Sequence, residues 1–356
     1  MERWENNIYG MVPKAEWLDV GFDVTRQNDP IDSLFDDKKT NNLFAEWDTI
    51  ASEYQIPMMA EFHAFDTETK TTFRVPVDHK NIEKGLIKVK INQSERMRAL
   101  LNSGVQDSRI KDYILRDGIN LAEQVFTRSK VAKNEVMATG QMTIVENGLN
   151  LTIDYGVPAA QKAFSIDLVR TGDLTAQIQE IIDYATSKGI TISGMMTSKK
   201  NITKMRNNAG LQKNINGNVG AGAIVRATDF NDFMSEEFGI NQIITNDLSY
   251  GASAALGDGR PAITTAKYFP ENKITFFATN PGGKLGVGLW GDPPEVDIEK
   301  FGNTGGSEPT VSPYVYVSQY KENDPAVIWT KASALFVPVI YNPNFLFIST
   351  VTDSGA

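Results

Sequence analysis

The strongest periodic pattern in the chain lies in residues 107–138, where apolar and small side chains recur every three or four positions: Ile110, Ile114, Gly118, Leu121, Val125, Ser129, Ala132 and Val136. This spacing places them along one face of an α-helix. Asp107 is a favourable N-cap, and Gly140 is a favourable stop signal. We expect a helix of about 30 residues with one buried face. At ~1.5 Å per residue it would exceed ~40 Å, which indicates an elongated subunit.

Alternating positions predict extended structure on both sides of this helix. Residues 58–91 contain apolar segments separated by polar turns, and from Ile87 to Ile91 β-branched residues alternate with lysines, which gives one apolar and one basic face. A two-stranded ribbon is only marginally stable alone in water, so we expect this excursion to lie on a neighbour. Asn147-Gly148 separates two further alternating runs within 141–156 and predicts a β-hairpin.

From about residue 166 the pattern is mixed α/β. Helices are expected at 173–189, 198–207 and 229–239, and strands at 190–196, 241–246, 273–278, 287–291 and 313–320. Loops rich in Gly, Asn or Pro are expected at 208–222, 251–263, 280–286 and 302–312. The apolar block 326–351 is typical of strands in a buried sheet.

The first 53 residues show no sustained pattern beyond a short helix expected near 41–53. They combine Trp4, Trp17 and Trp47 with many acidic residues. Because tryptophans are costly to leave in water, we expect an arm that lies against another surface, with a second subunit as one candidate.

Charge is distributed unevenly over the N-terminal third of the chain. Residues 1–53 hold twelve acidic and five basic residues, a net charge of −7, whereas residues 70–98 hold eight basic and three acidic residues, a net charge of +5. Two interpretations remain open. The segments form two solvated surfaces of a monomer, or the acidic arm of one subunit meets the basic stretch of its neighbour.

Composition narrows the function classes. The 356 residues suffice for two domains, and 41% hydrophobic with 22% charged residues is typical of a globular protein. A net charge of −9 argues against binding nucleic acid over the whole surface.

No run approaches the ~18 apolar residues of a membrane span, and Glu2 and Glu5 argue against a signal peptide, so we expect a soluble chain that is not exported. With no Cys and two His, the chain has little equipment for metal or nucleophilic chemistry.

Three short motifs resemble functional sites but lack the context that the chemistry needs. Gly286–Gly291 fits G-x-G-x-x-G, yet Asp292-Pro293-Pro294 follows where a dinucleotide loop requires a helix. Gly282-Gly283-Lys284 lacks the Ser or Thr of a P-loop. Glu61 and His63 share a strand face without a third ligand for zinc.

A set of short segments in a fixed order resembles the major capsid proteins of tailed phages. The segments are Asp-Pro-Ile at 29–31 with Leu-Phe at 34–35, Gln-Ile-Pro at 55–57, Ala-Thr-Gly-Gln-Met-Thr-Ile at 138–144, Val-Glu-Asn-Gly at 145–148, Ile-Asp-Tyr-Gly at 153–156, Phe-Val-Pro-Val at 336–339 and Asn-Pro-Asn at 342–344. The chain is similar to the Hong Kong 97 type of fold, and most of all to the lambda-like major capsid protein E family. The resemblance extends from about 29 to 352.

The resemblance implies an α+β capsid fold. Residues 1–57 would form an N-terminal arm, 58–92 an extended E-loop on the adjacent subunit, 93–165 with 325–356 a P-domain that carries the long spine helix, and 166–324 an α/β A-domain. No long helical region precedes the arm, so a separate scaffolding protein is implied. The candidate subunit-contact residues are Trp4, Trp17, Phe35, Phe65, Lys70, Phe73, Arg74, Lys80, Lys84, Lys88 and Lys90.

The implied function is structural, with no enzymatic activity, cofactor or metal. Hexamers and pentamers would build the icosahedral head shell of a virion in the host cytoplasm, with a scaffolding protein and a portal as partners and a decoration protein left open. The shell would enclose double-stranded DNA without sequence-specific binding and without a membrane. Two alternatives remain, an encapsulin-type compartment of the same fold and an α/β enzyme or ligand-binding protein with its site in 166–324. Few His and no Cys disfavour the second.

Overall fold

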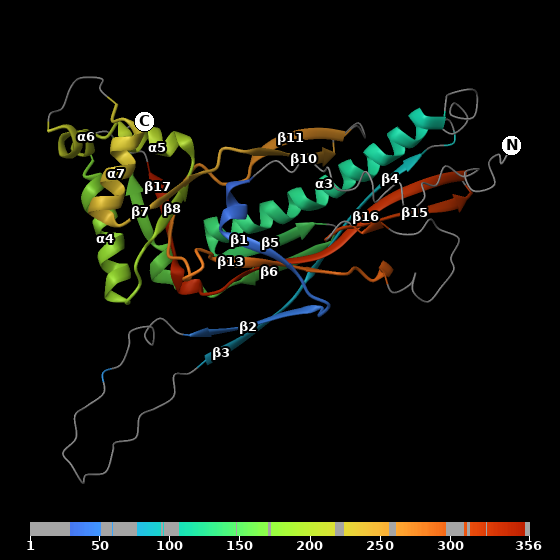
Figure 1. Cartoon of the computed structure of the whole chain (residues 1–356), viewed down its shortest axis with the longest axis horizontal. Coiled ribbons are helices and arrows are strands. Elements are labelled where there is room, and N and C mark those ends of the chain that lie inside the picture. The colour runs from blue at the N-terminus through green and yellow to red at the C-terminus, as the bar shows by residue number, and fades with distance from the viewer. Residues whose placement is uncertain are drawn as a thin grey trace, which may run out of the picture.

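The computed structural model describes residues 29–50, 59, 77–93, 95, 107–146, 148–169, 172–217, 224–255, 261–296, 310–311, 314–324 and 326–352. The predicted long helix is confirmed as α3 (Asp107–Thr139), which runs along an elongated body (Figure 1). Its predicted apolar face is buried where the side chains are described, since Leu121, Val125, Ala132 and Val136 are at most 3% exposed. The side chains of Ile110 and Ile114 lie outside the described part.

A six-stranded sheet, here called the long sheet, packs against α3. Its strand order is β1 (Phe35–Lys39), β13 (Gly286–Gly291), β16 (Ala326–Ile340), β15 (Tyr316–Asn323) and β14 (Thr310–Val311), and β4 (Gly85–Gln93) also pairs with β16. Because β15 and β4 pair with overlapping parts of β16, they lie on opposite sides of that strand. β1 and β13 are parallel, and the other pairs are antiparallel.

A second sheet, here called the compact sheet, lies at the other end of the body. Its order is β7 (Phe164–Asp167), β17 (Leu346–Thr352), β12 (Lys273–Phe277), β8 (Gly194–Thr197) and β9 (Gln242–Thr245). The helices α4 (Leu174–Ser187), α5 (Lys199–Arg206), α6 (Ala209–Asn216) and α7 (Ala227–Phe238) gather at this end (Figure 1). Ile178, Met195, Phe230 and Phe276 belong to its core, which is separate from the core under α3.

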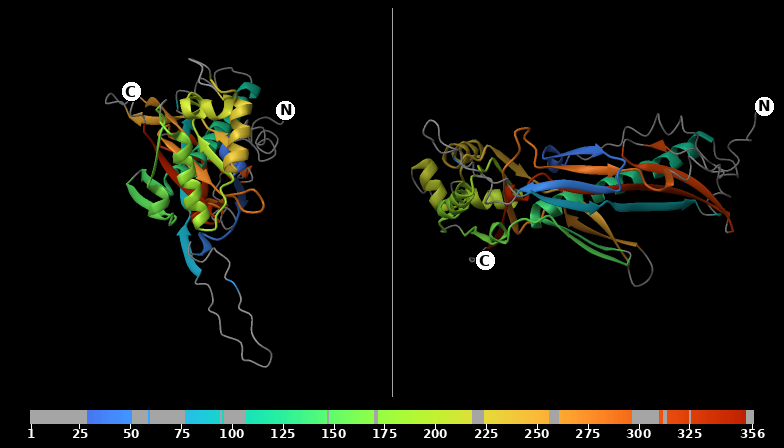
Figure 2. Two further views of the ribbon diagram at one scale, coloured as in Figure 1. Left: turned by 90° about the vertical axis from the view of Figure 1, so that its left-hand side faces the viewer. Right: turned by 90° about the horizontal axis from the view of Figure 1, so that it is seen from below.

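Three antiparallel strand pairs extend from these sheets. The ribbon consists of β2 (Phe44–Ile50) and β3 (Val77–Glu83), and it projects from the body (Figures 1 and 2). The hairpin consists of β5 (Gln141–Glu146) and β6 (Leu149–Asp154), joined through Gly148 at φ 81°, which confirms the hairpin predicted from Asn-Gly. The third pair is β10 (Ser249–Ala255) with β11 (Pro261–Lys267). Short 3₁₀ turns lie at Pro30–Ser33, Ala159–Lys162 and Pro343–Phe345.

Three sequence predictions are wrong. The helix expected near 41–53 is strand β2, the loop 208–222 contains α6, and the loop 251–263 contains most of β10 and the start of β11. Helix α6 forms because the Asn208 side chain accepts the amide of Leu211 and Gly217 ends the helix in the left-handed region. The strand expected at 190–196 is reduced to Gly194–Thr197. The caps Asp173 and Ser198 are confirmed, since each side chain accepts a first-turn amide.

The strands of the structure cross the limits expected for the arm and the E-loop, and the assignment of these parts stays a prediction. Residues 35–39 form β1 inside the long sheet, so this part of the expected arm belongs to the body. The ribbon takes one strand from 44–50, within the expected arm, and β4 from the expected E-loop pairs with β16. The expected division at residue 325 also crosses the sheets, because β13 to β15 precede it in the long sheet whereas β17 follows it in the compact sheet.

Candidate subunit interface and buried ion pairs

Two of the predicted subunit-contact residues are buried inside their own chain. Phe35 is 2% exposed and packs against β13, where a Cβ on Gly286 would lie 2.5 Å from its Cε1 atom. Lys84 is also 2% exposed and donates hydrogen bonds within its own subunit. Both assignments are therefore corrected: these residues hold the fold together and are not available to a neighbour.

Lys88 and Lys90 lie on the exposed face of β4, as the alternating pattern predicted, while Ile87 and Val89 pack against the core. The Lys90 ammonium lies 4.1 Å from the centroid of the Trp329 ring. Lys80 pairs across the ribbon with Trp47. Their contact with a neighbour stays a prediction. The other predicted contacts, Trp4, Trp17, Phe65, Lys70, Phe73 and Arg74, lie outside the described residues, as do Glu61 and His63.

The hairpin has one apolar face that is covered only at its root. The strand register places Met142 opposite Ile153 and Ile144 opposite Leu151 on this face. Met142 and Ile153 are at most 7% exposed, whereas Leu151 and Leu149 are 50% and 61% exposed. A two-stranded hairpin with an open apolar face is a marginal structure in water, so this face is a candidate for contact with another surface.

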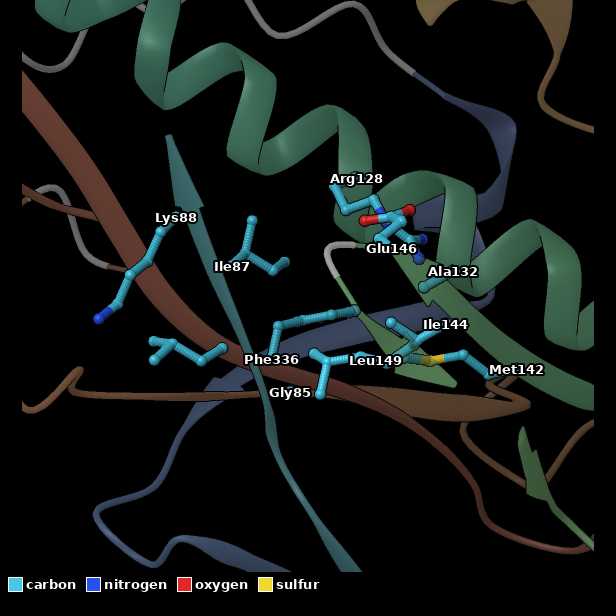
Figure 3. Close-up of a pocket in the computed structure, with 11 residues that line it drawn as sticks. Gly85, Ile87, Lys88, Arg128, Ala132, Met142, Ile144, Glu146, Leu149 and Phe336 are labelled. Atoms are coloured by element: carbon cyan, nitrogen blue, oxygen red, sulfur yellow. The ribbon is translucent and has the colours of Figure 1, made fainter. Parts of the chain in front are cut away.

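A groove of about 130 Å³ lies between this apolar face, the edge of β4 and α3 (Figure 3). Ile87, Ala132, Phe336, Ile144 and Leu149 are among the apolar residues that line it. At its rim, the Arg128 guanidinium lies 3.2 Å from the carboxylate of Glu146, which ties α3 to the hairpin. The groove was not predicted, because its walls come from four separate parts of the chain.

The root of the hairpin is rigidly attached. The Glu135 carboxylate accepts the amide of Thr143 at 2.9 Å, and burial raises the pKa of Glu135 although this hydrogen bond opposes the shift. The hydroxyl of Tyr155 donates to the carbonyl of Pro338 at 2.6 Å, and its ring stacks on Trp47 of the ribbon. The ribbon and the hairpin therefore meet at their roots.

A buried lysine joins the N-terminal segment to α3. Lys133 is 1% exposed, and its ammonium lies 3.2 Å from Asp32 and 3.0 Å from Asp37. The indole N–H of Trp290 also donates to Asp37, at 2.9 Å. No local pattern in the sequence predicts this cluster, because Lys133 and its two partners are about a hundred residues apart in the chain.

The glycines of the G-x-G-x-x-G motif have a packing role. They lie in strand β13, between β1 and β16, and Asp292-Pro293-Pro294 separates Gly291 from the helical residues that begin at Glu295. A Cβ on Gly288 would lie 2.4 Å from the Asp37 carboxylate and 3.1 Å from Cε of Lys133. The motif therefore leaves space for the buried ion pair, and its rejection as a dinucleotide loop is confirmed.

A second ion cluster connects residue 295 to the long sheet. The Glu295 carboxylate lies 2.9 Å from the Lys88 ammonium and also accepts a hydrogen bond from Lys331. Burial by itself opposes ionisation of Glu295, but the hydrogen bonds from Lys331 and Lys88 outweigh it and lower its pKa to about 2.

This lowered pKa predicts how stability depends on pH. A carboxylate with a depressed folded-state pKa adds stability that is complete above its unfolded value, near 4.5, and is lost as pH falls towards 2. We expect Glu295→Gln to reduce the free energy of unfolding by up to ~3 kcal/mol at pH 7 and by much less near pH 2. Urea unfolding of unassembled subunits across this pH range would measure it. Parallel curves for the two proteins would contradict the assignment.

Among the described residues, no group of three or more His, Cys, Asp or Glu is arranged to hold a metal ion. In the same part of the chain, no helix is long and apolar enough to cross a membrane.

Comparison with known proteins gives one family and a set of similar folds. The sequence matches the family described as phage major capsid protein E over residues 63–351. The fold is similar to the putative capsid protein of a prophage from E. coli CFT073, with 12% identity, a TM-score of 0.55 and coverage of 96% of this chain and 99% of that chain. It is also similar to a phage-related protein from Bordetella bronchiseptica RB50, with 12% identity, a TM-score of 0.52 and coverage of 96% and 97%. No curated protein matches the sequence.

Proposed function

The chain belongs to the phage major capsid protein E family, and from this membership we propose that it is the structural subunit of an icosahedral phage head shell. The observation that carries the proposal is the family match over residues 63–351. The elongated body with its projecting ribbon supports it, because a subunit of this shape offers several surfaces to several neighbours (Figure 2). The role is structural and not enzymatic.

We further propose the standard capsid roles for the parts of the chain. The residues before β1 form the arm, the ribbon with residues 51–76 forms the E-loop, α3 with the long sheet forms the P-domain, and the compact sheet with α4 to α7 forms the A-domain. Hexamers and pentamers of the subunit close the shell by repeated head-to-tail contacts.

The groove is the proposed receptor for the E-loop of an adjacent subunit. Residues 51–76 join the outer ends of β2 and β3 and contain Ile56, Met58, Phe62, Phe65 and Phe73, an apolar content that suits an apolar groove. Among the described strands, β4 pairs only with β16, so its other edge is available to a strand of the neighbour. An interface of ~800 Å² per partner, repeated around the subunit, would hold the particle together.

The proposed partners are a scaffolding protein and a portal, with a decoration protein left open, and the proposed place of assembly is the host cytoplasm, with a final location in the virion. The shell encloses double-stranded DNA without reading its sequence, and a subunit with a net charge of −9 suits a container that does not adhere to its contents. The family match favours this function over an encapsulin-type compartment and over an α/β enzyme.

The test is the assembly state of the purified chain. We expect hollow particles by negative-stain microscopy when the chain is produced with its scaffolding protein, and hexamers, tubes or aggregates when it is produced alone. Sedimentation velocity would give the size distribution in both cases. A compact monomer at high concentration in both preparations would overturn the proposal.

A further inference from the structure

Lys84 lies at the base of the ribbon, where β3 ends and β4 begins. Its side chain is buried, and its ammonium donates to the carbonyl oxygens of Thr40 at 2.9 Å, Asn42 at 2.6 Å and Trp290 at 3.2 Å. It also lies 2.5 Å from the hydroxyl of Thr40, and its backbone N–H donates to the carbonyl of Leu43 at 3.0 Å. An ammonium has three protons to donate, so these acceptors use its full capacity.

These acceptors come from two different segments, and Lys84 itself lies in a third. Thr40 and Asn42 lie between β1 and β2, Trp290 lies in β13, and Lys84 itself connects β3 to β4. The Lys84 ammonium therefore connects the bases of both ribbon strands to the long sheet. Beside it, a Cβ on Gly291 would lie only 3.1 Å from Nζ of Lys84, so the glycine leaves room for this group.

If this position only stabilised the fold, an apolar side chain would contribute more stability than a buried lysine. Within the part of the chain that the structure describes, no carboxylate accepts a hydrogen bond from the Lys84 ammonium. Burial lowers the pKa of Lys84, and Asp292 opposes that shift only in part. Buried charges contribute little net stability, but their directional hydrogen bonds can fix one geometry among several. The feature that needs fixing here is the direction of the ribbon.

Other contacts of the ribbon with the body include apolar ones, and the charge of Lys80 also acts on Asp154 of the hairpin. Ala45 is 1% exposed, and Trp47 and Ile82 pack against the core under α3. Apolar contacts hold the ribbon down but specify its angle weakly. A seven-residue strand is about 23 Å long, so a tilt of about 10° at the base moves its far end by about 4 Å, more than half the ~7 Å repeat of side chains on one face.

We propose that Lys84 is a positioning residue that sets the direction in which the ribbon leaves the body, and thereby the neighbour's surface that the E-loop reaches. The second part of this inference rests on the proposed function as a shell subunit. The first part concerns the single subunit and can be tested without assembly.

Because the chain has no Cys, two introduced cysteines provide the only sites for spin labels. Glu46→Cys on β2 and Gln124→Cys on α3 are both exposed and report the distance between the ribbon and the body. Pulsed electron resonance would measure the distance between the two labels in the full chain, diluted with unlabelled chain. Three proteins would be compared: the parent with Lys84, the Lys84→Met variant, and the exposed-site variant Lys38→Met as the matched control. Electron microscopy would count closed shells for the same three proteins.

With Lys84→Met we expect the distance distribution to widen about twofold, because a two-stranded ribbon without its basal anchor is poorly held. We expect the yield of closed shells to fall about tenfold, since only chains with a competent ribbon direction can bind. Lys38→Met should change neither value. An unchanged distance distribution in Lys84→Met would overturn the inference.

Two further outcomes are informative. If circular dichroism shows Lys84→Met to be unfolded, the Thr40→Val variant tests the inference instead, because it removes one acceptor of the ammonium and keeps the side-chain shape. A wider distance distribution in this variant supports the inference, and an unchanged distribution overturns it. If the parent chain forms no shells, the proposed function fails, while the distance measurement still tests the role of Lys84 in the subunit.

Discussion

Replacing Leu149 and Leu151 together with Asp is expected to abolish shell assembly and to leave the subunit folded. Both side chains are at least half exposed in the single subunit, so its core does not depend on them. In the assembled shell they would face the apolar segment of a neighbour, where a carboxylate loses water without gaining a partner. At a cost of at least ~2 kcal/mol per interface, each association constant falls at least about 30-fold.

The opposite face of the same strand supplies the control. Asn150→Asp with Thr152→Asp adds the same number of charges to β6 at exposed positions that alternate with the leucines. Sedimentation velocity and negative-stain microscopy would measure assembly, and circular dichroism would measure folding. If both variants assemble equally well, the groove is not part of the subunit interface. If the leucine variant unfolds, the apolar face of the hairpin belongs to the core of the subunit.

Lys133→Met is expected to lower the free energy of unfolding of the unassembled subunit by about 3 kcal/mol, because it leaves Asp37, whose side chain is 18% exposed, without its ammonium, whereas Asp32 keeps Lys130 at 3.9 Å. We expect this large loss of stability because Lys133 is buried, and not because it lies closer to its partners than other lysines do. Lys200 lies 3.1 Å from Glu271, as close as Lys133 is to Asp32 and Asp37, but the two side chains are 61% and 40% exposed. Lys200→Met should therefore cost no more than about 1 kcal/mol.

A denaturation series distinguishes the loss of an ion pair from the loss of packing. Adding Asp37→Asn to Lys133→Met removes one stranded charge, so the double variant should be less destabilised than the sum of the two single variants. If Lys133→Met loses no more stability than Lys200→Met, the buried cluster does not support the junction between α3 and the N-terminal segment.

The elements that sequence analysis predicted correctly are those with their own local signals. Helix α3 has a long apolar stripe, α4 and α5 begin at Asp173 and Ser198, and the hairpin turns at Asn-Gly. Strand β2 lacked such a signal, because Phe44 and Trp47 are three residues apart and imitate a helical face. Its partner β3 begins 27 residues after β2 ends. Strands β10 and β11 contain mostly small or polar residues, so their alternation is weak.

The buried charges could not be predicted because they depend on contacts between distant segments. A lysine is normally expected at the surface, and only folding brings Lys84 to Trp290 and Lys133 to Asp32. One indirect signal was present. Gly288 and Gly291 interrupt an apolar strand at the points where these two lysines need space. Glycine in the interior of a strand often marks a close approach by another group, and this interpretation was available from the sequence.

The position of β16 and β17 in their sheets has a consequence for synthesis on the ribosome. Both strands lie between partners, β16 within the long sheet and β17 within the compact sheet, although they are the last two strands of the chain. Neither sheet can close until residues 326–352 have emerged, so earlier strands wait for partners up to about 250 residues away. A chain that lacks residues 326–352 therefore has no complete body to carry its ribbon, and polymerisation is delayed until these residues have been synthesised and have paired.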